Sequence, residues 1–186
     1  VYTWYFDKAG KYYGEFGAMR IPVSHETTWH YINLFGLGTQ SMTSPERNNF
    51  LYVHNTRLRI SDSIQDILYP KYDLTPQERA MPYQELYDYA FTYLLNQLSP
   101  GARAELISIL PEYSPELLPL MNTGLRKTLE SLGLSQGAIS LLSGTNPMSG
   151  ALLNISYDEI IQEEYIFNFM NVYNINGGNA CLPYAF

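Results

Sequence analysis

The sequence has 186 residues, of which 46% are apolar, so it can bury a sizeable core as one domain or as a compact part of a larger one. Its formal net charge of -7 argues against a surface for nucleic acid or an anionic membrane, because clustered Lys and Arg drive phosphate binding. No apolar run is long enough to cross a bilayer. Cys181 is the only cysteine, so an internal disulfide is excluded and a cysteine-based metal site is not expected.

The first part of the chain predicts a hairpin followed by a helix. Residues 1–6 and 12–16 are rich in aromatic and β-branched side chains, and the polar residues between them favour a turn. The helix is expected after this hairpin, with the hydroxyl of Ser24 as its N-cap and Gly36 or Gly38 at its end.

Two further extended runs, Phe50–His54 and Arg57–Ile60, predict a second hairpin that turns at the two residues between them. His54 would then lie in a strand as a partly buried, hydrogen-bonded residue and not as a catalytic one. His25 and His30 do not share a helical face, so no metal site is expected there.

From residue 74 the pattern is helical. Thr75, Pro76 and Glu78 supply an N-cap, a proline in the first turn and an acidic residue near the helix N-terminus. The expected helices cover residues 83–98, 100–110, 123–132 and 135–142, with a short one after Ser114. Gly144 is expected to end the helix over 135–142.

The last part predicts a helix over 151–164, a strand over 166–175, a turn at Gly177–Gly178 and a helix over 182–186. The first of these helices carries four acidic residues, which we interpret as a solvated face and not as a paired-carboxylate site. These residues are Asp158, Glu159, Glu163 and Glu164.

Together these elements predict an α+β fold that is predominantly helical. Residues 1–72 would mix short strands with a helix, residues 73–166 would be helical, and residues 167–186 would form a strand, a turn and a helix. The sequence shows no repeat or linker, so we expect residues 1–186 to be one interdependent segment.

The most informative stretch is Tyr12–Pro22. Gly17 allows backbone conformations that a side chain would forbid, and Ala18 adds little bulk, so another molecule could lie against the main chain. Arg20 follows with a planar, charged fork that matches a carboxylate. From these residues alone, a strand, a turn and a surface arginine remain the alternative.

This stretch resembles the flavin-dependent L-amino-acid oxidases of the amine oxidase superfamily, in which a Gly-x-Met-Arg-x-Pro segment lies against the flavin. Residues 176–183, read as Asn-Gly-Gly-Asn-Ala-Cys-Leu-Pro, are similar to the strand-to-helix element Gly-Gly-x-x-x-Leu-Pro of the same family. Residues 129–150 are also similar. The resemblance extends over nearly the whole chain.

The resemblance implies a parent enzyme that uses FAD to deaminate an L-amino acid oxidatively, giving a keto acid, ammonia and hydrogen peroxide. Gly17, Ala18, Met19 and Arg20 would contact the cofactor, and Arg20 would also hold the substrate carboxylate. It assigns no catalytic residue and no metal. Where venom-type members have a histidine near the substrate, this sequence has Gln162, which indicates a different substrate preference.

The sequence lacks the Gly-x-Gly-x-x-Gly fingerprint that a flavin-binding half needs for the pyrophosphate. We therefore expect an internal segment of a larger oxidase, an incomplete part of the flavin amine oxidase fold that is inactive alone. Its partner would be the remainder of the enzyme, and a homo-oligomer is compatible with it. The lone cysteine favours a cytoplasmic compartment, although any leader would lie upstream of Val1.

Two other functions fit the same residues. A related flavin monooxygenase, which converts an amino acid such as tryptophan to its amide, would use the same Arg20 segment. A non-catalytic helical interaction module would need no flavin. Flavin absorbance in the full-length protein would exclude the module, and the reaction product would separate the two enzymes.

Overall fold

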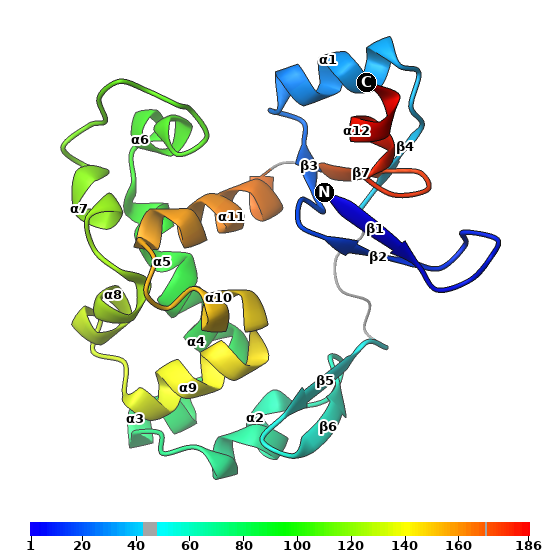
Figure 1. Ribbon diagram of the computed structural model, residues 1–186. Coiled ribbons are helices and arrows are strands. Elements are labelled where there is room, and N and C mark those ends of the chain that lie inside the picture. Colours follow the sequence, from blue (N-terminus) through cyan, green and yellow to red (C-terminus); the bar gives the residue numbers. More distant parts are fainter. Residues whose placement is uncertain (43–47, 170) are drawn as a thin grey trace. The chain divides into compact units, whose positions relative to one another are not determined.

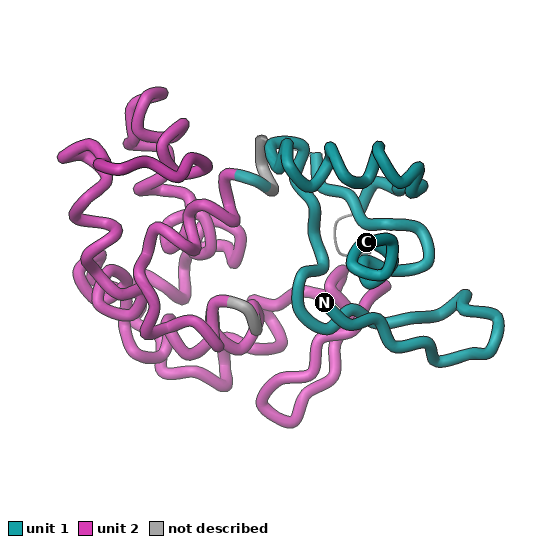
Figure 2. The backbone as a smooth tube through the Cα atoms, turned by 45° about the horizontal axis from the view of Figure 1, so that its top comes forward, with its two compact units in different colours: residues 1–44, 166–186 teal, residues 45–165 magenta. Residues whose placement is uncertain are grey.

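The computed structural model describes residues 1–42, 48–169 and 171–186. The chain divides into two compact units (Figure 2): unit 1 comprises residues 1–44 and 166–186, and unit 2 comprises residues 45–165. Both chain ends thus belong to unit 1. The change of pattern near residue 72 falls inside unit 2 and does not coincide with either boundary between the units.

Unit 1 begins with the predicted hairpin (Figure 1), which is confirmed. Strands β1 (Tyr2–Tyr5) and β2 (Tyr13–Phe16) pair antiparallel, with Thr3 opposite Glu15. Thr3 is buried, whereas the side chains of Tyr2 and Phe16 on the other face are exposed and contact each other. The hairpin therefore has one face toward the rest of unit 1 and one exposed aromatic face.

A three-stranded sheet joins the two ends of the chain. Its order is β3 (Ile21–Pro22), β7 (Val172–Ile175), β4 (Thr39–Ser41), and both outer strands run antiparallel to β7. Helices α1 (Glu26–Leu34) and α12 (Cys181–Ala185) complete the unit. A small core forms between the sheet and the helices; its buried members are Ile21, Ile32 and Ile175.

Helix α1 differs from the sequence prediction at its start. Its N-cap residue is His25 and no side chain caps it, so the prediction that Ser24 caps the helix was wrong. Trp29 instead fixes the first turn, because its Nε1 donates to the carbonyl of Pro22 at 2.9 Å. Gly36 follows the helix at φ +62°, a conformation that favours glycine, which confirms it as the stop.

Unit 2 opens with the second predicted hairpin, which is confirmed with a shifted turn. Strands β5 (Phe50–Val53) and β6 (Thr56–Arg59) pair antiparallel. His54 and Asn55 form the two-residue connection with φ of 53° and 56°, values that match the twist of a tight hairpin. His54 is exposed in this turn, so its placement in a strand as a partly buried residue was wrong.

Helices make up the rest of unit 2, and the fold is predominantly helical with small sheets, as expected. Their bounds are α2 Ile64–Leu68, the 3-10 turn η1 Tyr69–Lys71, α3 Pro76–Ala80, α4 Tyr83–Phe91, α5 Tyr93–Gln97, α6 Pro100–Glu105, α7 Leu118–Met121, α8 Leu125–Ser131, α9 Gln136–Thr145, α10 Pro147–Ala151 and α11 Tyr157–Phe169. The last four residues of α11 belong to unit 1. No helix in the described ranges is both long and apolar enough to span a membrane.

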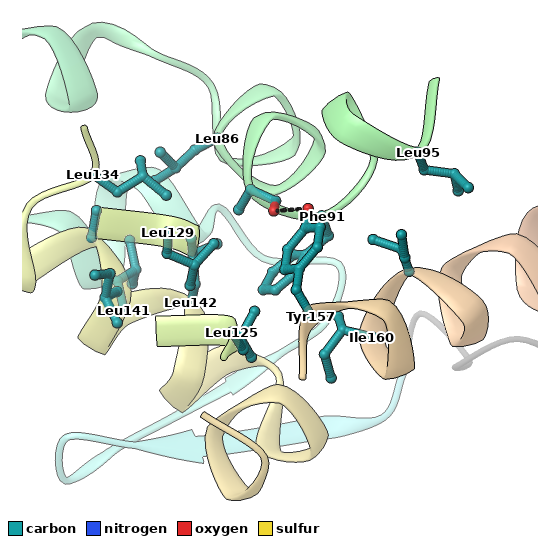
Figure 3. Packing of buried hydrophobic residues seen from close by; sticks show 14 of the residues in the cluster. Leu86, Phe91, Leu95, Leu125, Leu129, Leu134, Leu141, Leu142, Tyr157 and Ile160 are labelled. Atoms are coloured by element: carbon teal, nitrogen blue, oxygen red, sulfur yellow. Dashed lines mark hydrogen bonds between the residues drawn. The ribbon is translucent and has the colours of Figure 1, made fainter. Parts of the chain in front are cut away.

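These helices share one large apolar core (Figure 3). Phe91 of α4, Leu129 of α8, Leu142 of α9 and Tyr157 of α11 are all almost completely buried in it. The hydroxyl of Tyr157 donates to the carbonyl of Ala90 at 2.8 Å, so this polar group is paired where water is excluded. Burial raises the pKa of Tyr157, which keeps the hydroxyl a donor.

The predicted helix over 83–98 is broken into α4 and α5 at Thr92. The Thr92 hydroxyl donates to the carbonyl of Asp88 at 2.9 Å, and such bonds back to the preceding turn bend helices. The helix that begins at Pro100 ends at Glu105 and not near residue 110, and the short one after Ser114 begins only at Leu118.

Two other helix boundaries were also wrong. Gly144 lies inside α9, where an added Cβ would come within 2.7 Å of a Val53 methyl, so the glycine permits close packing and does not end the helix. The predicted helix over 151–164 is α11, which starts later and runs to Phe169, so the predicted strand over 166–175 is reduced to β7. The buried residues Tyr157, Ile160 and Ile161 give α11 its helical spacing.

A buried carboxylate connects two helix N-termini in unit 2. Glu78 completes a capping box with Thr75 at the start of α3, and its Oε1 accepts the backbone N–H of Ser135, the N-cap of α9, at 2.8 Å. The Ser135 hydroxyl donates to Oε2 at 2.7 Å. Desolvation raises the pKa of Glu78, but the hydrogen bonds from Ser135 and Thr75 together outweigh it and hold that pKa below its usual value.

We expect Glu78→Gln to lower the free energy of unfolding at neutral pH by about 1–3 kcal/mol, because an amide cannot accept all these bonds. A carboxyl with a depressed pKa stabilises the fold above its unfolded pKa, and this stabilisation is lost as the pH falls through the lower folded pKa. The difference in free energy of unfolding between wild type and variant should therefore shrink in acid. Urea unfolding at several pH values measures it, with the exposed Glu85→Gln as control; a pH-independent difference would contradict the mechanism.

We expect Gly137→Ala to destabilise unit 2, with Gly101→Ala as a matched control. Each glycine is the second residue of a helix with a serine N-cap, Ser135 or Ser99. A Cβ on Gly137 would overlap the carbonyl of Asp73, whereas on Gly101 it would meet nothing closer than 3.9 Å. Urea unfolding followed by circular dichroism should show a loss of about 1–3 kcal/mol for the first change and none for the second. Equal effects would argue against the overlap.

Candidate functional site

The two motif segments, Tyr12–Pro22 and residues 176–183, are joined in unit 1 by hydrogen bonds of Asn179. Its backbone N–H donates to Oε1 of Glu15 at 2.8 Å, and its side-chain Nδ2 donates to the carbonyl of Ala18 at 3.1 Å. Glu15 lies on β2, and Ala18 belongs to the loop between β2 and β3. The Gly-Gly turn region therefore holds the arginine-containing loop directly.

Thr3 on β1 extends this connection. Its hydroxyl donates to Oε2 of Glu15 at 2.9 Å and accepts the N–H of Ala180 at 3.2 Å. Thr3 and Asn179 are only 6% and 5% exposed, so water cannot replace these bonds. We call Thr3, Glu15 and Asn179 the Thr3–Glu15–Asn179 network.

The turn at Gly177–Gly178 is shaped to pack against this network. Both glycines have positive φ, +84° and +112°, and a Cβ on Gly178 would overlap the side chain of Thr3. The hydroxyl of Tyr5 donates to the carbonyl of Gly177 at 2.5 Å. Desolvation, with smaller contributions from the charges of Cys181 and Glu15, raises the pKa of Tyr5, so it remains a donor at neutral pH.

All four predicted site residues follow one another in the loop between β2 and β3. Gly17 has φ +107°, and both Gly17 and Ala18 are exposed, whereas Met19 and Arg20 are half-buried. Within the part of the chain that the structure describes, the N–H groups of Ala18 and Met19 donate to no acceptor. The loop thus presents low-bulk backbone with free donors, followed by an arginine whose Nε is shielded from solvent.

This arrangement fits a planar ring better than a metal ion. Exposed backbone without large side chains accepts a flat ligand at close range, and free N–H groups can donate to its polar edge. The described residues contain no group of three or more His, Cys, Asp or Glu side chains that could hold a metal.

Comparison with known proteins assigns the family. The model of flavin containing amine oxidoreductases matches residues 1–183. The chain belongs to this family. The resemblance found in the sequence is thereby confirmed, and a flavin is the cofactor that the family implies.

Individual relatives carry a more specific name. The chain is 24% identical to an L-amino-acid oxidase of Naja atra and 25% identical to one of Gloydius blomhoffii, in each case over 98% of the chain and 34% of the relative. It is 27% identical to a putative L-amino-acid oxidase of Bacillus subtilis over 91% of the chain and 34% of the relative. The chain spans about a third of the length of these relatives.

The sequence had suggested that all four acidic residues of α11 face solvent, and this prediction was wrong. Glu159 is exposed, but Glu164 is half-buried, and its Oε1 accepts the hydroxyl of Tyr87 at 2.5 Å. Asn146 also donates to that hydroxyl, at 3.2 Å. Desolvation first, and the charge of Glu164 second, raise the pKa of Tyr87, so the phenol stays protonated. The contact joins α4 to α11 and serves packing in unit 2.

Gln162 on α11 is used within unit 2 as well. Its Nε2 donates to the carbonyl of Leu106 at 2.5 Å and holds the segment that follows α6. The described contacts of Gln162 thus give it a structural role, and they offer no direct support for the substrate preference that the sequence suggested at this position.

Sequence reasoning missed the Thr3–Glu15–Asn179 network as part of the site. Thr3 stands as a small polar residue between Tyr2 and Trp4 in an aromatic strand, which is a local sign that it faces a polar partner. Nothing local shows that Asn179 joins the two motif segments, because its partners Glu15 and Ala18 are 164 and 161 positions away along the chain.

We expect Gly178→Ala to destabilise unit 1 more than its neighbour Gly177→Ala does. Both substitutions force alanine into a positive φ, which costs about 1–2 kcal/mol of stability in each variant. Only Gly178→Ala also overlaps Thr3, since a Cβ on Gly177 would meet nothing closer than 3.8 Å, and overpacking adds about 1–3 kcal/mol.

Tryptophan fluorescence during urea unfolding is the suitable measurement, because the two tryptophans of the chain, Trp4 and Trp29, both lie in unit 1. An equal loss of stability in the two alanine variants would mean that the close contact between Gly178 and Thr3 does not contribute to the effect.

Proposed function

We propose that this chain is part of an FAD-dependent L-amino-acid oxidase. The reaction combines an L-amino acid, oxygen and water to give a 2-keto acid, ammonia and hydrogen peroxide. The observation that carries the proposal is the loop from Gly17 to Arg20, which presents exposed low-bulk backbone and then an arginine, and which Asn179 ties to the Gly-Gly turn. The relatives of Naja atra and Bacillus subtilis, which are named as L-amino-acid oxidases, support the same reaction.

In this proposal, Gly17, Ala18 and Met19 would contact the flavin. A side chain at Gly17 would need a strained positive φ, and larger groups at Ala18 would keep a planar ring away from the backbone. The flavin, when bound, accepts the two electrons that the substrate loses and passes them to oxygen.

The pyrophosphate of FAD is expected to bind outside this chain. Such groups bind at the N-terminus of a helix preceded by a Gly-x-Gly-x-x-Gly turn, and this sequence contains no such turn. The 186 residues alone are therefore expected to retain no flavin.

Arg20 binds the α-carboxylate of the substrate in this proposal. Its guanidinium can form two parallel hydrogen bonds with a carboxylate, which sets both the position and the orientation of the amino acid. By holding the carboxylate, Arg20 would keep the amino acid in one orientation for the reaction, and such positioning is worth several kcal/mol. Recognition of the carboxylate is also what would separate amino-acid from simple amine substrates.

We expect Arg20→Met in the full-length enzyme to lower kcat/KM for the amino acid. The corresponding activation free energy should rise by about 2–4 kcal/mol, since two charge-assisted hydrogen bonds are lost. Arg20→Lys should lose less, because it keeps the charge but not the fork. Oxidation of the corresponding decarboxylated amine should be unaffected in both variants.

The ratio of amino-acid to amine turnover measures this effect, and the exposed Arg57→Met serves as control. A ratio that Arg20→Met leaves constant would remove the carboxylate role. Keto acid, ammonia and peroxide should form in equal amounts, whereas an amide product would show a monooxygenase instead.

A further inference from the structure

The loop that carries Arg20 belongs to no helix or strand, so its position depends on contacts with other parts of unit 1. Strand β2 ends at Phe16 and β3 begins at Ile21, and the four residues between them include the whole predicted site. The carbonyl of Ala18, two residues before Arg20, accepts a hydrogen bond from Asn179. This bond anchors the middle of the loop.

The amide of Asn179 is suited to this task because both of its ends are used. Its Oδ1 accepts the N–H of Ile175 at 2.9 Å, and its Nδ2 donates to the carbonyl of Ala18 at 3.1 Å. A backbone N–H can only donate and a carbonyl can only accept, so the two partners determine which way the amide points. A buried amide in one fixed orientation is a rigid link between β7 and the loop.

Glu15 and Thr3 hold the backbone at Asn179 and Ala180 in place. Each oxygen of the Glu15 carboxylate accepts one bond, Oε1 from the Asn179 N–H and Oε2 from the Thr3 hydroxyl. Bonds to a charged acceptor are stronger than neutral ones, and two of them fix the carboxylate. Three side chains outside the loop, those of Thr3, Glu15 and Asn179, therefore help to fix its position.

We propose that Asn179 is a positioning residue for carboxylate recognition: it fixes the Ala18 carbonyl and thereby the guanidinium of Arg20. This inference rests on the proposed function, because it assumes that Arg20 binds the substrate carboxylate. Asn179 itself touches neither substrate nor flavin in this proposal. Its loss should weaken the binding of carboxylate ligands and leave amines without a carboxylate unaffected.

The substitution Asn179→Asp tests this in the full-length flavoenzyme. The introduced carboxyl has the same shape and still accepts from Ile175, but when ionised it cannot donate to Ala18. When protonated it regains an O–H donor. Burial and the nearby Glu15 carboxylate should raise the pKa of the introduced carboxyl above that of an exposed aspartate, so function should return as the pH falls toward about 5.5. The exposed Asn154→Asp changes the charge equally and is the control.

Binding of benzoate, followed by the change in flavin absorbance, gives a readout that does not depend on turnover. We expect Asn179→Asp to raise the Kd of benzoate roughly ten- to a hundredfold at about pH 8, and to approach the wild-type Kd at about pH 5.5. The KM for the amino acid should follow the same pH dependence, while amine turnover stays unchanged. Asn154→Asp should match wild type throughout.

The outcomes separate the two proposals. If Arg20→Met leaves benzoate binding unchanged, the carboxylate role of Arg20 fails, and the role of Asn179 fails with it. If Arg20→Met abolishes binding but Asn179→Asp binds like wild type, or loses amine and amino-acid turnover equally without recovery in acid, only the positioning role is overturned.

A second variant keeps the test decisive if Asn179→Asp does not retain flavin. Thr3→Val has nearly the same shape and removes the hydroxyl that holds Glu15. We expect it to raise the Kd of benzoate less than Asn179→Asp, with no recovery in acid and no change in amine turnover. If Thr3→Val binds benzoate with the wild-type Kd, the positioning role of the Thr3–Glu15–Asn179 network is overturned.

Discussion

The hydrogen bonds of Asn179 are the interaction on which unit 1 depends. They join residues that are 161 and 164 positions apart, and with the bond between Thr3 and Ala180 they close the two ends of the chain onto each other. Burial of these polar groups would cost several kcal/mol if they were unpaired. Because each has a partner, the same groups that would destabilise an apolar core instead specify one arrangement of the two motifs.

The sheet topology makes this closure necessary. Strand β7 comes from the end of the chain but lies between β3 and β4, so it carries the Gly-Gly turn next to the loop that contains Arg20. Gly178 then packs against Thr3 where no side chain would fit. Backbone conformation thus explains both glycines of the Gly-Gly turn, and lack of space is a second reason for Gly178.

Local signals predicted the elements of unit 2 well where the deciding contacts are local. Thr75 caps a helix as expected, because an N-cap bonds only to the next few residues. The failures have non-local causes. Gly144 stays inside α9 because Val53 and Tyr72 approach it, and the aromatic run after Glu164 continues α11, whose buried face packs on other helices. The contacts of Gly144 and of α11 both involve residues far away in the sequence, so a window of neighbouring residues does not reveal them.

The sequence by itself determined the helical character, both hairpins, the family and the candidate loop from Gly17 to Arg20, since these follow from periodicity, turn chemistry and a short motif. Only the tertiary structure showed that Asn179, Glu15 and Thr3 hold this loop, and that His54 lies in a turn. The physical reason is the same in each case. A hydrogen bond or a steric contact between distant residues depends on where the backbone brings them, and single-sequence patterns record only what neighbours along the chain can do.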